Sequence, residues 1–272
     1  MSHADVPRGM ELVQMAGWNQ TEDDWAIMLK VGSGYGIHDE VGTLLASSIV
    51  ISYPPQVGWI GMVLVDEAAR RKGHASRLLE HVIAVLRADG LVPMLDATPA
   101  GREVYRKLGF TDVAPISRWR GVASGSSRAT KSPPARLNLS KLAAAVAMDA
   151  RAFGTPRTAL LSDFSARPGA VTLALPDGRG ALWSRAGRTA TQIGPVVAES
   201  VDDAQALCAM ALDDIRGPVL LDVPDRETVL AAMLSTRGFT VERPFIRMAA
   251  GASSHLLTLG AAMRVVAGPE LG

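Results

Sequence analysis

Apolar residues recur with two different periods along the first 120 positions of this 272-residue chain. Strand-like runs cover 41–52, 59–65 and 91–95. Helices are predicted over 15–29, in one piece or in two with Thr21 as a cap, and over 99–108. A further helix with one face on a sheet is predicted from the spacing of Ala75, Leu78, Leu79, Val82, Ile83 and Leu86. This alternation predicts the α/β class, with a twisted mixed sheet (an α+β arrangement of strands) flanked by helices.

The second half of the chain repeats the first. Leu95–Arg118 and Leu221–Arg247 both read Leu-Asp, Pro, a helical stretch and then Gly-Phe-Thr, a Pro and an Arg. From Gly109 and Gly238 onward these matches keep one offset, since 238 − 109 = 129. Residues 59–65 also correspond to 192–198, each followed by a helical pattern, and Ser200 with Asp203 is a capping pair at the start of the second. We therefore predict one fold that occurs twice in tandem.

A stretch without periodic apolar residues separates the two copies. Residues 121–135 read GVASGSSRATKSPPA, which is typical of a linker. The predicted organisation is a first domain over 1–120, a linker over 121–135 and a second domain over 136–272.

Composition excludes several classes of protein. A formal net charge of +1 is too small for the broad basic surface that nucleic-acid binding needs. A single cysteine, Cys208, excludes an internal disulfide framework and a Cys-rich zinc site, and its place on an apolar helix stripe predicts a buried thiol. The five histidines show no metal-ligand spacing, so no metal is expected. No apolar run approaches the ~18 residues of a membrane span, which favours a cytoplasmic protein without membrane contacts. The sequence does not set an oligomeric state.

The two copies differ at one strand–helix junction. Thirteen positions separate Val65 from Leu78, but nine separate Ala198 from Leu207. The extra residues of the first copy fall at Arg70-Arg71-Lys72-Gly73. Free amides and a positive dipole at a helix N-terminus, with small residues and cations beside them, favour a phosphate or pyrophosphate. The alternative is a plain surface turn with solvated charges.

The same loop belongs to a recognisable pair of motifs. Arg70-Arg71-Lys72-Gly73-His74-Ala75 fits a strand, then Gln/Arg-x-x-Gly-x-Gly/Ala, then a helix, and Tyr105–Phe110 fits Tyr-x-x-x-Gly-Phe. In these features the chain resembles the GNAT superfamily of acyl-CoA-dependent N-acetyltransferases. In the runs 16–25, 95–101, 193–198 and 243–248 it is similar to two-domain bacterial members whose second GNAT-like domain is degenerate. The resemblance covers nearly the whole chain.

The resemblance implies a site for acetyl-CoA and a proton donor. The pantetheine arm is expected along the strand at Met62, Val63 and Val65. The pyrophosphate is expected on the loop and helix start, at Arg70, Arg71, Lys72, Gly73, His74, Ala75 and Ser76. Tyr105 is expected to protonate the departing thiolate, and the alternative is an ordinary core aromatic. Thr98 stands where the family often has an Asn that binds cofactor or water.

The general base is less defined. The strand 59–65 has no acidic residue, so Asp96 is the first candidate, with a turn-capping Asp as the equal alternative because Asp222 repeats it. The acidic run 22–24 either attracts a cationic amine or forms a solvated helix face. From the second domain, residues expected near the acceptor are Asp149, Phe153, Arg157, Trp183 and Arg185.

The sequence thus predicts direct transfer of an acetyl group from acetyl-CoA to a primary amine, with a small molecule or polyamine as acceptor. Leu234 stands where Tyr105 does, so one active site per chain is expected. The alternative is a catalytically silent acyl-CoA-binding sensor or scaffold. A kinase-like nucleotide loop would need Gly-x-x-x-x-Gly-Lys-Ser/Thr, which the sequence lacks.

Overall fold

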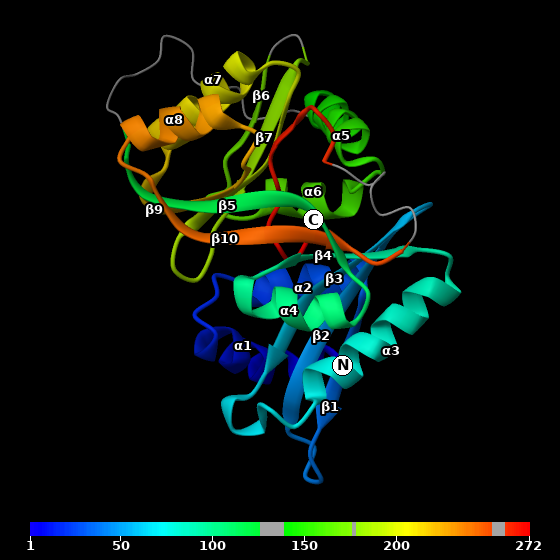
Figure 1. Ribbon diagram of the computed structural model, residues 1–272. Helices are drawn as coiled ribbons and strands as arrows, with labels where there is room; N and C mark the ends of the chain where they lie inside the picture. The colour runs from blue at the N-terminus through cyan, green and yellow to red at the C-terminus, as the bar shows by residue number, and fades with distance from the viewer. Residues whose placement is uncertain (126–138, 176–177, 252–258) are drawn as a thin grey trace. The chain divides into compact units, whose positions relative to one another are not determined.

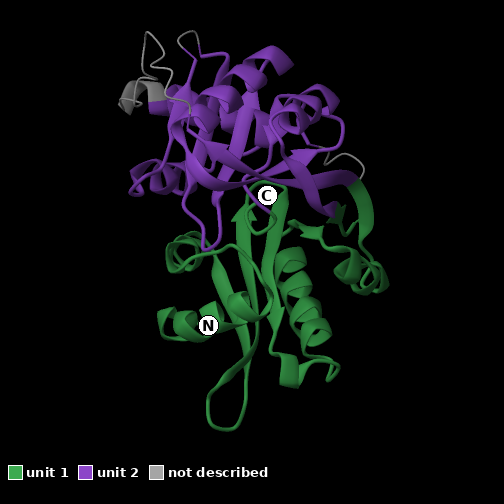
Figure 2. Cartoon of the chain, turned by 90° about the vertical axis from the view of Figure 1, so that its left-hand side faces the viewer, with its two compact units in different colours: residues 1–113, 247–257, 269–272 green, residues 114–246, 258–268 purple. Residues whose placement is uncertain are grey.

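The computed structural model describes residues 1–125, 139–175, 178–251 and 259–272. The chain forms two compact units, coloured separately in Figure 2. Unit 1 contains 1–113, 247–257 and 269–272, and unit 2 contains 114–246 and 258–268, less the undescribed positions in each. Both units are mixed α/β sheets with helices on them, which confirms the predicted fold class (Figure 1).

Unit 1 begins with two helices and a hairpin that the sequence only partly predicts. Its elements in chain order are η1 (His3–Asp5), α1 (Val6–Met15), α2 (Glu22–Val31), β1 (Ser33–His38), β2 (Leu44–Tyr53), β3 (Val57–Val65), η2 (Glu67–Ala69), α3 (His74–Ala88), β4 (Val92–Ala97) and α4 (Pro99–Lys107). Of the two alternatives for 15–29, the structure has two helices, because α1 ends at Met15 and α2 begins at Glu22. Thr21 does cap the second, because its side chain accepts from the Asp24 amide in a reciprocal capping box.

The sheet of unit 1 has the order β1-β2-β3-β4, followed by the end of β10 (Thr240–Ala249). The predicted apolar stripe of α3 packs on it, and a Cβ placed on Gly58 would collide with Leu86 of that helix. The helices α1 and α2 also pack against strands of this sheet. The C-terminal residues 269–272 belong to this unit too, and a Cβ placed on Gly61 would be 2.6 Å from the Glu270 carbonyl oxygen.

Unit 2 repeats this plan. Its elements are β5 (Thr111–Ser124, from Ala114), α5 (Leu139–Phe153), α6 (Thr158–Ala166), β6 (Thr172–Ala174), β7 (Gly180–Arg185), β8 (Thr191–Ala198), α7 (Val201–Asp214), β9 (Arg216–Pro224), α8 (Thr228–Thr236), the first part of β10, and β11 (Met263–Val265). The order is β10-β5-β9-β8-β7-β6, with β11 paired to β8. Cys208 lies in the core on α7, fully buried as predicted.

The predicted linker begins too early. Residues 121–124 belong to β5 and pair in register with β9, from Gly121 opposite Val219 to Ser124 opposite Arg216. The Gly and Ser residues there are tolerated because pairing on β9 and burial of Ala123 stabilise the strand. Residues 126–135 of the predicted linker lie outside the described part of the chain.

The compact units also divide the chain differently from the predicted 1–120 and 136–272. The end of β10, from Arg247, belongs to unit 1, whereas β5 from Ala114 onward belongs to unit 2. The repeat itself is visible at the two turns after α4 and α8, where Gly109 and Gly238 both have left-handed φ angles, of 87° and 80°. At each position glycine ends the helix because other residues are strained there.

Candidate active site

The centre of unit 1 is a parallel strand pair that separates. β3 and β4 pair only from Val57 opposite Val92 to Trp59 opposite Met94. Beyond Trp59 the two strands continue without pairing to each other, although β3 runs to Val65 and β4 to Ala97. The separation leaves one edge of β3 available for another partner.

A bulge in β3 marks the start of that edge. Ser47 is opposite Leu64 and Ile49 is opposite Gly61, so Met62 and Val63 together face one residue of β2. Met62 has a φ of 52°, and its carbonyl accepts from the Ser47 hydroxyl at 2.9 Å. Within the described residues, no strand pairs with 62–65 on the β4 side. The predicted pantetheine residues Met62, Val63 and Val65 thus line an open strand edge.

The loop after β3 leads into an uncapped helix. Gly73, the residue before α3, has a φ of 79°, and no side chain caps the first turn. A Cβ at Gly73 would meet nothing within 4 Å, so the space beside this residue is open. Free first-turn amides and the dipole of a 15-residue helix favour an anion at this place.

Cations surround the same turn. Arg70 forms an exposed ion pair with Glu67, at 3.2 Å. Arg71 and Lys72 are exposed, and neither pairs with a carboxylate among the described residues. The Nδ1 atom of half-buried His74 is buried and has no hydrogen-bond partner. A phosphate group fits this arrangement of amides and charges.

Tyr105 lies on α4, after β4. Its ring centre is 5.9 Å from that of Phe110, and a Cβ on Gly101 would be 2.9 Å from the Tyr105 ring. The side chain is half-buried, and desolvation raises the pKa of Tyr105 to about 12. The phenol therefore stays protonated at neutral pH and keeps a hydroxyl hydrogen to donate.

Thr98 caps the N-terminus of α4. It is the residue before α4, and its hydroxyl oxygen accepts from the Gly101 amide at 3.2 Å. Its hydroxyl hydrogen is still able to point elsewhere, so contact with a cofactor or water stays a prediction.

Asp96 is held by an arginine from the far end of the sequence. Arg247 Nε and Nη2 donate to the two carboxylate oxygens, at 2.8 and 2.9 Å. The Asp96 side chain is 1% exposed, and the guanidinium lies 4.6 Å from the centre of the Trp59 ring. A carboxylate engaged in this way is a poor proton acceptor, because the paired charge favours its ionised form. The geometry disfavours Asp96 as the general base.

Unit 2 contains the same pair. Arg118 donates to both carboxylate oxygens of Asp222, each at 2.8 Å, and Gln192 adds a third hydrogen bond at 3.0 Å. Both members are buried. Because the pair recurs in a copy that lacks the tyrosine, its role is structural. The alternative of a structural Asp96 is therefore favoured, although its partner is an arginine and not a turn.

In unit 2 the separated edge is filled by the chain itself. β8 and β9 pair only from Thr191 to Ile193, and β8 then has its own bulge at 194–195. β11 pairs with the next residues, Met263 opposite Val197 and Val265 opposite Val196. These two positions of β8 correspond to 64 and 63 of β3. The edge that is open in unit 1 is therefore occupied in unit 2 by a strand of the same unit.

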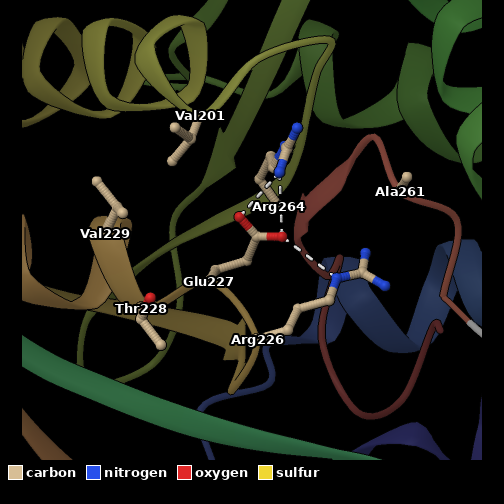
Figure 3. Close-up of a pocket in the computed structure, with 7 residues that line it drawn as sticks. All are labelled: Val201, Arg226, Glu227, Thr228, Val229, Ala261 and Arg264. Atoms are coloured by element: carbon tan, nitrogen blue, oxygen red, sulfur yellow. Dashed lines mark hydrogen bonds and ion pairs between the residues drawn. The ribbon is translucent and has the colours of Figure 1, made fainter.

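The helix after β8 is also closed to an anion. The Ser200 hydroxyl caps α7 by accepting from the Asp203 amide at 3.1 Å, and two aspartates lie in the first turn. Beside it, Arg264 donates to the carbonyls of 198 and 199 at 3.1 and 3.0 Å and pairs with Glu227. Arg264 and Glu227 line a cavity of about 340 Å³. Figure 3 shows the two side chains directed toward each other and paired.

The residues of the second domain that were expected near the acceptor have other partners. Asp149 and Arg157 form a buried ion pair at 2.7 Å, and the Arg157 guanidinium lies 3.9 Å from the Phe153 ring centre. Trp183 donates to the Ser165 hydroxyl at 3.0 Å, and Arg185 donates to a backbone carbonyl of unit 2 at 2.7 Å. These contacts stabilise unit 2, and they give the expected role at the acceptor no support.

The acidic run 22–24 begins α2. Asp24 is buried and completes the capping box with Thr21, whereas Glu22 and Asp23 are exposed. Across the described ranges, no cluster of three or more His, Cys, Asp or Glu side chains is arranged to hold a metal. In the same part of the chain, no helix is long and apolar enough to cross a membrane.

Comparison with known families identifies the class of protein to which the separated parallel strands, the bulge and the uncapped helix belong. A model described as the acetyltransferase (GNAT) family matches residues 13–110, and one described as the acetyltransferase (GNAT) domain matches 145–258. The chain belongs to the GNAT family of acetyltransferases and carries two of its domains.

Two curated relatives extend over most of the chain. The holothin acyltransferase of Pseudoalteromonas sp. (strain SANK 73390) is 28% identical over 241 residues, covering 81% of this chain and 80% of the relative. YitH of Bacillus subtilis (strain 168), an uncharacterised N-acetyltransferase, is 25% identical over 237 residues, with 85% and 83% covered.

Solved structures share the fold. A Pyrococcus horikoshii protein assigned as an acetyltransferase has a TM-score of 0.82 at 16% identity, covering 100% of this chain and 94% of that one. A tandem GNAT protein from the clavulanic acid biosynthesis pathway has a TM-score of 0.61 at 12% identity, with 91% and 94% covered. The predicted tandem GNAT architecture is confirmed.

Proposed function

We propose that the protein is an acyl-CoA-dependent N-acetyltransferase that moves an acetyl group from acetyl-CoA to a primary amine, with its one active site in unit 1. The observation that carries the proposal is the open edge Met62–Val65 beside the uncapped start of α3. In unit 2 the equivalent edge is paired with β11. A single site per chain follows from this difference.

The residues of unit 1 fit an acyl-CoA. Backbone groups of Met62–Val65 are available to pair with the amides of a pantetheine arm. The amides that follow Gly73, with Arg71 and Lys72 beside them, suit a pyrophosphate. When bound, acetyl-CoA supplies the thioester whose acetyl carbon is transferred.

Tyr105 is the proposed proton donor to the thiolate that leaves. Its pKa of about 12 keeps the phenol protonated throughout the neutral range. Its hydrogen bond to the sulfur strengthens as negative charge develops there in the transition state, and the proton follows as the thiolate departs. The Tyr105 ring packs near Phe110, which restricts the direction of the hydroxyl.

We propose direct attack of the amine, without an acyl-enzyme. The chain's one cysteine, Cys208, is fully buried in unit 2, and desolvation raises its pKa to about 12. A buried thiol of this kind is not a nucleophile at neutral pH.

A thiol-release assay with acetyl-CoA tests the function. The amine panel contains primary alkylamines, polyamines, arylamines, a lysine peptide, and holothin because one relative is named for it. Release of free thiol together with an acetylated small amine is the expected result. Tight binding of coenzyme A without turnover on any amine would instead support the sensor or scaffold.

A further inference from the structure

The proposed reaction needs a group that takes a proton from the amine. β3, from Val57 to Val65, contains no acidic residue. Asp96 is paired through both oxygens with Arg247. We therefore consider the other carboxylates of unit 1.

The C-terminal residues bring a buried glutamate into unit 1. The Trp59 indole donates to the Pro269 carbonyl at 3.0 Å, and the Tyr53 hydroxyl donates to the Leu271 carbonyl at 2.9 Å. Between these two anchors lies Glu270, which is only 3% exposed. A glutamate at this depth is uncommon, because burial of a charged side chain carries a desolvation cost.

Glu270 lies where β3 and β4 separate. Its backbone packs on Gly61, two residues beyond Trp59, the last residue of β3 that pairs with β4. Gly61 also directly precedes Met62, where the open edge begins. In unit 2 the corresponding glycine, Gly194, is covered by Val266, an apolar residue. The unit with the open edge thus has a glutamate at this backbone position, and the closed unit has a valine.

We propose that Glu270 is the general base of the reaction, which rests on the proposed function. Its carboxylate binds the ammonium form of the acceptor and accepts one proton from it. The neutral nitrogen then attacks the thioester carbon, so that a C–N bond forms and the C–S bond breaks. Tyr105 gives its proton to the departing sulfur and regains one from the nitrogen, while the proton on Glu270 passes to solvent.

The test compares Glu270→Gln with the parent enzyme on two acceptors. One is the primary alkylamine turned over fastest in the panel, and the other is an arylamine of similar size, which is already neutral at pH 7. The expected loss in kcat/KM is about 10²-fold or more for the alkylamine at pH 7. It should be much smaller for the arylamine, and it should shrink for the alkylamine as the pH rises toward the pKa of that amine.

Controls separate this role from a structural one. Coenzyme A affinity should be unchanged in Glu270→Gln, and Glu80→Gln, an exposed change on α3, should keep full activity. Should the glutamine variant fold poorly, Glu270→Asp keeps a carboxylate and should retain measurable activity on the alkylamine, rising with pH. Equal losses on both amines at every pH, or no loss, would overturn the role of Glu270 while leaving the transferase function intact. A parent enzyme inactive on every amine would overturn the function itself.

Discussion

Units 1 and 2 share the same arrangement of strands and helix but differ at the strand edge and the helix start. Each has a parallel strand pair that separates after three residue pairs, followed by a bulge and a helix. Unit 1 leaves the edge of β3 open and its helix uncapped. Unit 2 covers the edge with β11, caps α7 with Ser200 and places Arg264 at the strand end. A duplicated fold can therefore lose a ligand site by filling it with its own chain.

The largest expected effect comes from removing the proposed acid. Tyr105→Phe keeps the ring near Phe110 and removes only the hydroxyl, so kcat should fall by about 10²- to 10⁴-fold. The matched change in unit 2, Leu234→Met, conserves volume in the core and should leave kcat unchanged. Steady-state thiol release measures both. A Tyr105→Phe enzyme as active as the parent would remove Tyr105 from the mechanism.

The pH dependence of the reaction rate gives a second test of Tyr105 as the acid. Desolvation raises the pKa of Tyr105 to about 12, so the acid form is present at every pH below that value and is lost only above it. The rate should therefore show no decline caused by Tyr105 between about pH 7 and 10. A falling limb in that range that disappears in Tyr105→Phe would contradict the assignment.

The two buried ion pairs should behave alike, in contrast to the two sites. Asp96→Asn and Asp222→Asn each leave a buried arginine without its charge partner, at a cost of about 3–5 kcal/mol in the free energy of unfolding. Urea denaturation measures both. Folded Asp96→Asn should keep its activity, and a specific loss of turnover in folded protein would restore Asp96 as the candidate base.

The smallest expected effect concerns the loop cations. Arg71→Ala and Lys72→Ala should each weaken coenzyme A binding by about 2- to 5-fold, because exposed charges contribute little, with a smaller effect at high salt. Arg237→Ala, an exposed change in unit 2, is the control and should leave the affinity unchanged. Identical affinities in all three variants would show that the amides alone hold the anion.

The sequence was informative where periodicity and local motifs carry the structure. The apolar stripe of α3, the Thr21 and Ser200 caps and the two turn glycines were all predictable from neighbouring residues. The sequence repeat also predicted that the two units have the same fold. These features depend on interactions within a few turns of chain.

Long-range features escaped prediction. Arg247 pairs with Asp96 across 151 positions, and Trp59 holds Pro269 across 210. β11 and the residues 269–272 are too short for any hydrophobic period to show. Nothing local to Asp96 indicates its arginine, so the sequence alone makes this strand-end carboxylate look available as a base.

The stoichiometry of coenzyme A binding tests the central claim most directly. Calorimetric titration of the full chain should give one site per chain, because only unit 1 leaves the strand edge and the helix start open among the described residues. Two equivalent sites per chain, or none, would contradict the account.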